Sequence, residues 1–146
     1  MIAALAALLL GAMGASQSLA DVVDNAAFHV YVMPTSAEAD SVTILASDSQ
    51  SRPTSVKIVY RLGDRLELTV LETMRADDDA SSPGPSPEPT GQIYMVNGYP
   101  ATYTVTGPYY QHVGWLKWTP PGVTVTISSM DMTDAPTLVN AALALY

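Results

Sequence analysis

Residues 123–128 read Val-Thr-Val-Thr-Ile-Ser, and residues 134–146 read Asp-Ala-Pro-Thr-Leu-Val-Asn-Ala-Ala-Leu-Ala-Leu-Tyr. Strict alternation in the first stretch predicts a strand that buries one face. Apolar positions three and four residues apart in the second predict an amphipathic helix. Its expected apolar face consists of Ala135, Leu138, Val139, Ala142, Leu143 and Tyr146. A one-sided sheet and a one-sided helix bury their apolar faces against each other, which predicts an α+β two-layer domain.

The start of this helix has its own signals. Thr133 or Asp134 can cap it, because a short oxygen-bearing side chain accepts from the free N–H groups of the first turn. Pro136 fits that first turn, where its missing N–H costs nothing.

Two stretches upstream predict hairpins. Residues 55–61 and 65–74 both alternate around Gly63-Asp64, and in the second run Glu72 falls on the same face as the apolar residues Leu66, Leu68 and Val70. Residues 93–96 and 99–106 flank Asn97-Gly98, a strong signal for a type I′ turn. Further strands are expected at residues 27–33, 42–46 and 114–118. Turn-linked neighbours make the predicted sheet antiparallel.

The first twenty residues have a different character. Residues 2–15 carry no charge, and as a helix they would span about 21 Å, short of a hydrocarbon core of about 30 Å. Ser18-Leu19-Ala20 forms a small-x-small cleavage site, although no Lys or Arg precedes the apolar run. We interpret residues 1–20 as a signal peptide or the remnant of a membrane anchor, with a buried core helix as a third reading. The first two readings place residues 21–146 outside the cytoplasm.

Residues 75–91 interrupt the pattern with Pro, Gly and acidic side chains and contain no large apolar residue. Such a composition cannot form a core, so we expect a disordered or extended loop. Neither flank has enough strands to form a core alone. Residues 21–146 are therefore expected to form one α+β domain that contains this loop.

Composition excludes several classes of function. The 146 residues contain 14 acidic and 6 basic side chains, for a net charge of -8, and no Cys. A nucleic-acid binder needs a basic face to displace counterions, so nucleic acid is not an expected partner. The absence of Cys removes disulfides, thiolate metal sites and a cysteine nucleophile.

The second half of the chain resembles a known family. It reads IYMVNGYPATY, then WLKWTPPGVTVTIS, then TLVNAALAL, and it follows FHVYVMP and VKIVYRLGDRLELTV upstream. This order resembles the bacterial DUF4367 domains, which lie outside the membrane, often behind an anti-sigma-factor-like membrane helix. It covers residues 27–145 and is carried by Gly98, Ala101, Leu116, Trp118, Gly122, Ile127, Leu138, Ala142 and Leu145. The resemblance implies a strongly curved antiparallel sheet packed by a C-terminal amphipathic helix, similar to the half-barrels of RseB and lipoprotein carriers.

An aromatic cluster is the candidate ligand-binding site. Aromatic rings combine large apolar area with a polar edge, which suits a binding surface, although core packing explains the same residues without function. The family pattern places Leu116 and Trp118 in the core. The candidate ligand-binding residues are Tyr99, Tyr103, Tyr109, Tyr110 and Trp115.

Catalytic and metal sites are not expected. His29 and His112 have no partner at a recognisable spacing, and the chain contains no G-x-S-x-G elbow and no S-x-x-K pair. The run at residues 77–79 is three consecutive Asp, which lacks the spaced pattern of a calcium loop and favours a solvated loop. We therefore expect no cofactor and no metal.

Three functions follow as hypotheses. The first is a non-enzymatic sensing or binding domain of the bacterial cell envelope, secreted or tethered to the membrane by its N-terminus. The second is a carrier of a lipid or other hydrophobic ligand in a half-barrel cavity. The third is a secreted hydrolase, which the missing catalytic residues disfavour. The expected partner is an envelope protein or a hydrophobic small molecule.

Overall fold

The computed structural model describes residues 17–34, 38–63, 66–75, 91–108, 111–131 and 133–146. In chain order the elements are α2 (Leu19–Asn25), β1 (Glu38–Ser47), β2 (Pro53–Leu62), β3 (Leu66–Met74), β4 (Gln92–Val96), β5 (Tyr99–Thr106), β6 (Val113–Trp118), β7 (Val123–Ser129) and α3 (Ala135–Ala144). No helix within these residues is long and apolar enough to cross a membrane.

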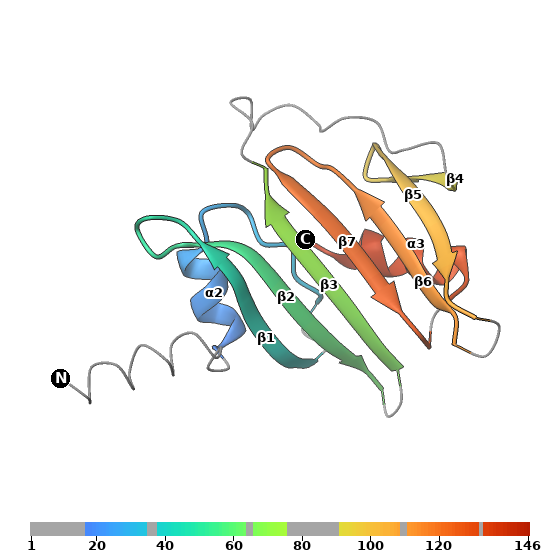
Figure 1. Cartoon of the computed structure of the whole chain (residues 1–146), viewed down its shortest axis with the longest axis horizontal. Helices are drawn as coiled ribbons and strands as arrows, with labels where there is room; N and C mark the ends of the chain where they lie inside the picture. The colour runs from blue at the N-terminus through green and yellow to red at the C-terminus, as the bar shows by residue number, and fades with distance from the viewer. Residues whose placement is uncertain (1–16, 35–37, 64–65, 76–90, 109–110, 132) are drawn as a thin grey trace.

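The seven strands form one open antiparallel sheet in the order β1-β2-β3-β7-β6-β5-β4 (Figure 1). The C-terminal helix α3 packs on one face of it. The predicted α+β fold with an antiparallel sheet and a C-terminal helix is therefore confirmed. The pairing of β3 with β7 joins the two halves of the chain, since it aligns Val70 with Ile127.

The two predicted hairpins form as expected. Strands β2 and β3 pair in a continuous register that includes Val56 opposite Glu72. Strands β4 and β5 pair through a turn in which Asn97 and Gly98 both have positive φ, at 50° and 88°. Positive φ at both central residues is what a type I′ turn requires, and Asn-Gly tolerates it better than other pairs.

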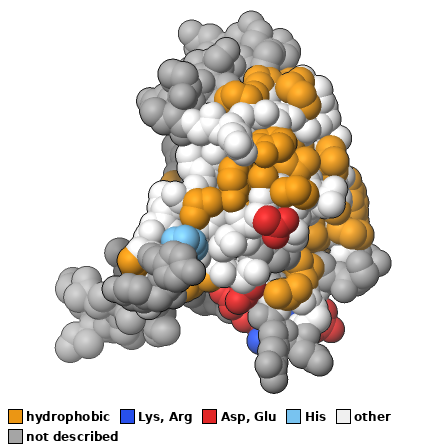
Figure 2. Space-filling model, turned by 90° about the vertical axis from the view of Figure 1, so that its right-hand side faces the viewer, with side chains coloured by type: hydrophobic (Ala, Val, Ile, Leu, Met, Phe, Trp, Pro, Cys, Tyr) orange, Lys and Arg blue, Asp and Glu red, His pale blue; other side chains and the backbone are white. Residues whose placement is uncertain are grey.

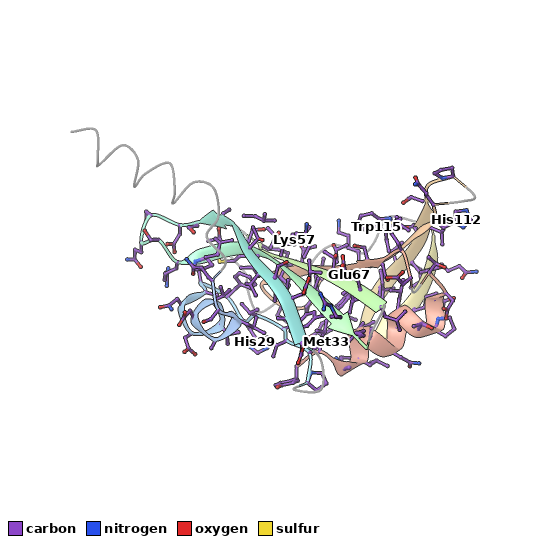
Figure 3. The ribbon with its side chains drawn as sticks, turned by 90° about the horizontal axis from the view of Figure 1, so that it is seen from below. His29, Met33, Lys57, Glu67, His112 and Trp115 are labelled. Carbon is purple, nitrogen blue, oxygen red and sulfur yellow. The ribbon has the colours of Figure 1, made fainter. Side chains whose placement is uncertain are left out.

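The sheet has one covered face and one uncovered face. The covered face, which we call the inner face, packs against α2, α3 and residues 27–33, and these share a single apolar core with the sheet. The opposite face, the open face, has no described helix over it (Figures 1 and 3). Strand β7 shows the contrast directly, because Val123, Val125 and Ile127 are buried while the threonines between them are partly exposed.

Residues 27–33 do not form the strand predicted from the sequence. They run in extended form across the inner face, outside the sheet, and we call them the strap. Within the strap, Val30 and Met33 are buried in the core. A strand within a sheet and an extended segment that crosses the face of a sheet both bury apolar side chains. The residue types at 27–33 therefore cannot distinguish these two arrangements. The prediction is wrong because the strap backbone makes single hydrogen bonds to Pro53, Tyr146 and the side chains of Tyr60 and Glu72, and these do not form a ladder with any one strand.

Helix α3 begins as predicted. The Asp134 side chain caps it by accepting a hydrogen bond from the Thr137 N–H at 3.1 Å, and Pro136 lies in the first turn. The hydrogen bond from the Thr137 hydroxyl, and to a lesser extent the one from its N–H, lowers the pKa of the Asp134 carboxyl. The buried stripe differs from the prediction, since Leu143 and Tyr146 are 47% and 61% exposed. The buried residues at this end of the chain are Ala135, Leu138, Ala141, Ala142 and Leu145.

The prediction that Tyr146 lies on the buried face of the helix is wrong for a local reason. The helix ends at Ala144, and Leu145 adopts an extended conformation with φ -69° and ψ 138°. The next residue therefore leaves the helical stripe that the sequence pattern continues through it.

The predicted signal-peptide cleavage site falls within the described residues, at helix α2. The expected cleavage site, between Ala20 and Asp21, lies inside this helix. Ser18 caps the helix by accepting from the Asp21 N–H at 3.2 Å, and Val22 is fully buried. The apolar run at residues 2–15 and most of the predicted loop, residues 76–90, lie outside the described residues.

Candidate functional site

The predicted aromatic cluster is divided between the two faces of the sheet. Tyr99 and Tyr103 lie half-buried on the inner face of β5, whereas Trp115 lies on the open face of β6. The register explains the separation, because Tyr103 faces Leu116 across the strands and Trp115 faces Thr104. Residues 109–110, the two remaining members of the predicted cluster, lie outside the described residues.

Tyr103 has a structural role. Its hydroxyl donates a hydrogen bond to the backbone carbonyl of Thr133, just before α3. Its ring meets Tyr94 edge to face, with 6.1 Å between ring centroids. These contacts tie β5 to the start of the helix and to the neighbouring edge strand. Packing therefore accounts for this tyrosine without a ligand.

The open face carries both lysines of the chain. The register places Lys57 of β2 opposite Leu71, Leu71 opposite Thr126, and Thr126 opposite Lys117 of β6. Three strand spacings separate the two lysines, or about 14 Å. Figure 3 shows Lys57 and Trp115 on the side of the sheet opposite Met33.

These lysines differ from Arg52 and Arg61. Arg52 pairs with Asp48 at 2.8 Å, and Arg61 pairs with Asp40 at 2.7 Å. Neither lysine makes an ion pair with a described residue. The row from β2 to β6 therefore carries two lysines without a described ion pair, on a face that also carries the exposed Glu67 of β3.

Apolar and hydroxyl side chains fill the space around the lysines. Leu71 and Trp115 are partly exposed, and the Trp115 indole N–H is held by the Thr106 hydroxyl at 2.6 Å. At the β4 end of the same face, Ile93 and Met95 are 51% and 58% exposed. Figure 2 views the molecule from its β4 edge, and hydrophobic side chains gather there, at the end of the sheet where β4, β5 and α3 lie. The hydroxyl residues of the open face include Thr43, Thr69, Thr102, Thr104, Thr124, Thr126 and Ser128.

The inner face contains an isolated buried acid. Glu72 lies on β3 with zero exposed surface, and one carboxyl oxygen, Oε1, accepts the Tyr31 N–H at 2.8 Å. The other oxygen, Oε2, has no hydrogen-bond partner within the described residues. Loss of hydration raises the pKa of Glu72 to about 8, and the bond from Tyr31 only partly opposes this. Such a carboxyl is mostly protonated at pH 7.

Two tyrosines stand near this acid. Tyr60 is buried beside it on β2 and accepts the Met33 N–H through its hydroxyl oxygen at 3.2 Å. Burial raises the pKa of Tyr60 to about 12. Burial and the neighbouring Tyr99 raise the pKa of Tyr31, with a smaller contribution from Glu72. At neutral pH the two tyrosines are therefore uncharged, and the Glu72 carboxyl is mostly protonated.

The histidines do not join this group into a metal site. His29 is exposed on the strap and packs edge to face on Tyr31, with ring centroids 4.6 Å apart. His112 is exposed at the far end of the sheet, before β6. No group of three or more His, Asp or Glu side chains among the described residues could hold a metal ion.

Comparison with known proteins adds no relative. No family model, no curated protein and no solved structure matches this chain.

The sequence pattern predicts only part of two features of the site. It placed Glu72 on the apolar face of β3, but the depth of burial depends on the strap, which was predicted as a strand. It also did not connect Lys57 with Lys117, because their common row exists only through the pairing of β3 with β7. Alternation within each strand was the one available signal, and it places both lysines away from the core.

Proposed function

We propose that this chain is a non-enzymatic binding domain that acts outside the cytoplasm and docks an acidic segment of an envelope protein on its open face. The observation that carries the proposal is the row that holds Lys57 and Lys117, which have no ion pair with a described residue. Export is supported by the uncharged apolar run at residues 2–15 and by the resemblance to extracytoplasmic domains.

The surface around the lysines suits a protein partner. Large exposed apolar side chains that gather on one face are a common mark of protein docking, and Ile93 and Met95 provide them here. A tryptophan held in place by a hydrogen bond, as Trp115 is, can anchor such an interface. Unpaired lysines at its margin attract acidic groups and favour the matching orientation of the partner.

The alternative of a hydrophobic carrier is less well supported. The inner face, where a half-barrel would hold its ligand, is filled by side chains of the strap, α2 and α3. A hydrophobic ligand would need to displace one of these segments. Such a displacement would take place on the inner face, whereas the proposed docking takes place on the open face.

Binding of poly-L-glutamate, as a probe for an acidic segment, tests the proposal by NMR. We expect chemical-shift changes centred on Lys57 and Lys117. The double variant K57Q/K117Q should bind about tenfold more weakly. The matched control Q50E/N140D makes the same change in net charge at exposed positions off the open face, in the β1–β2 turn and on α3, and should bind within twofold of the wild type.

Three outcomes would contradict the proposal. They are the absence of binding, shift changes confined to the inner face, and equal weakening in the two double variants. Binding of anionic vesicles or of an acidic polysaccharide in preference to poly-L-glutamate would point to a different class of partner and would also overturn it.

A further inference from the structure

We propose that the strap, residues 27–33, is a releasable cover whose hold on the inner face weakens when the buried Glu72 carboxyl loses its proton. The inference concerns the face opposite the proposed docking surface. It goes beyond the proposed function and does not depend on it.

The strap is attached by a small number of separate hydrogen bonds. The Tyr31 N–H donates to Glu72 Oε1 at 2.8 Å, and the Met33 N–H donates to the Tyr60 hydroxyl at 3.2 Å. Between them, Val32 and Tyr146 exchange two backbone bonds at 3.0 and 3.1 Å, and at the start of the strap the Ala27 N–H donates to the Pro53 carbonyl of β2 at 2.9 Å. The bonds of Tyr31 and Met33 therefore end on side chains of the sheet, and one of these side chains, Glu72, is a carboxyl group.

The surroundings of Glu72 favour its neutral form while the strap is in place. The side chain has no exposed surface and makes no ion pair with a described residue, and Oε2 has no described hydrogen-bond partner. An ionised carboxylate at this place would keep a single hydrogen bond, from Tyr31. Burying a charge with so little compensation is costly, whereas an open strap would let water reach both oxygens.

Release of the proton to solvent therefore favours the open strap. Glu72 has a higher pKa under the strap, about 8, than the ordinary value of 4.5 that it would regain in water. The open form consequently gains on the closed form as the pH rises from about 4.5 to about 8. Above this range both forms are ionised, and their ratio becomes constant.

Other titratable groups near the strap do not account for this change. Tyr60 from β2, Tyr31 from the strap and Tyr99 from β5 face the site as phenols, and Tyr146 faces Tyr60 from the C-terminus. Phenols stay neutral below about pH 10. His29 is the exception among these groups, since it is an imidazole and lies on the strap against Tyr31. A variant at this position is therefore the necessary control.

Opening would uncover apolar surface. The inner face beneath the strap and its neighbours includes fully buried side chains of β2, β3 and β7: Val56, Ile58, Val70 and Val125. A closed strap keeps this surface from other molecules. The proton on Glu72 would thus control access to the apolar face of the domain.

Amide hydrogen exchange in the full chain tests the inference. Protection factors of Tyr31, Val32 and Met33, corrected for the intrinsic effect of pH, should fall at least tenfold between pH 5.5 and pH 8. Those of Val125 and Ile127 in the centre of the sheet should stay higher than the strap factors at every pH, because these amides remain protected while the strap alone is open. The isosteric variant E72Q should hold the strap factors within twofold over the same range, and H29Q should retain the wild-type fall.

The inference is overturned if the strap factors do not change with pH, if E72Q shows the same fall, or if H29Q abolishes it. Protection factors of Val125 and Ile127 equal to those of the strap at every pH would also overturn it, because that result means that the strap exchanges only by global unfolding. If E72Q does not fold, the side-chain carboxyl carbon of Glu72 in the wild type provides the second measurement. Its titration midpoint must coincide with the pH above which strap protection becomes constant.

Discussion

The Tyr31 N–H donates a hydrogen bond of 2.8 Å to Glu72 Oε1, so the strap is tied to β3 through a carboxyl group that has no exposed surface. The second oxygen of that group has no described partner. A native structure that leaves a buried polar atom unpaired gives up stability at that point. Glu72 is therefore the residue at which stability and pH should be coupled most strongly.

Stability should fall as the pH rises across the range in which Glu72 titrates. The folded-state pKa of about 8 lies above the unfolded value, so the folded chain holds a proton that the unfolded chain has released. Stability is therefore lost between about pH 4.5 and pH 8, with an upper limit of about 5 kcal/mol. Urea denaturation at pH 5, 6.5 and 8 measures the effect. E72Q should remove most of this slope, and an unchanged slope in E72Q would assign it to other groups.

Shortening a buried side chain of α3 should destabilise the domain. Leu138 is fully buried against the sheet, and a change of this kind typically costs about 2–5 kcal/mol. L138A should therefore lower the free energy of unfolding by that amount in urea denaturation. L143A is the matched control on the same helix, since Leu143 is 47% exposed, and it should cost less than about 1 kcal/mol. Equal effects of the two variants would contradict the observed orientation of the helix.

Addition of one methyl group at Gly114 should also destabilise the domain. A Cβ there would lie 2.9 Å from the Thr133 Cα and 3.0 Å from the Leu138 Cδ1. Overpacking of this kind typically costs about 1–3 kcal/mol, so G114A should lower the melting temperature. The double variant G114A/L138A should cost less than the sum of its parts, because the Leu138 side chain is one of the two obstacles. Strict additivity would show that the backbone contact alone decides the cost.

Removal of the Tyr60 hydroxyl should loosen the strap. The Met33 N–H would lose its acceptor inside the core, which typically costs about 1–3 kcal/mol. Y60F should show this loss in chemical denaturation, together with faster exchange at the Met33 amide. Y94F removes a hydroxyl that bonds Gln92 at 2.8 Å on the exposed edge strand, and it should cost less than about 0.5 kcal/mol. A neutral effect of Y60F would mean that water replaces the hydroxyl.

Much of the fold was predictable because its signals are local. Alternation in β2, β3 and β7, the Asn97-Gly98 turn and the cap and proline of α3 act within a few residues, so the sequence alone indicates them. The aromatic site was less predictable. Tyr99, Tyr103 and Trp115 are close in sequence, but alternation and the β5–β6 register send Trp115 to the opposite face.

By itself, the sequence determined the antiparallel strands, the C-terminal helix and the face of each strand that turns to the core. These follow from backbone periodicity and side-chain polarity, which need no distant partner. Only the tertiary structure decided that residues 27–33 lie over the sheet, that Glu72 is buried beneath them, and that Lys57 and Lys117 share one row. Each of these depends on contacts between segments far apart in the sequence, such as Tyr31 with Glu72 and Val70 with Ile127. Local propensity carries no information about such contacts, since the same side chains pack equally well within a ladder or across its face.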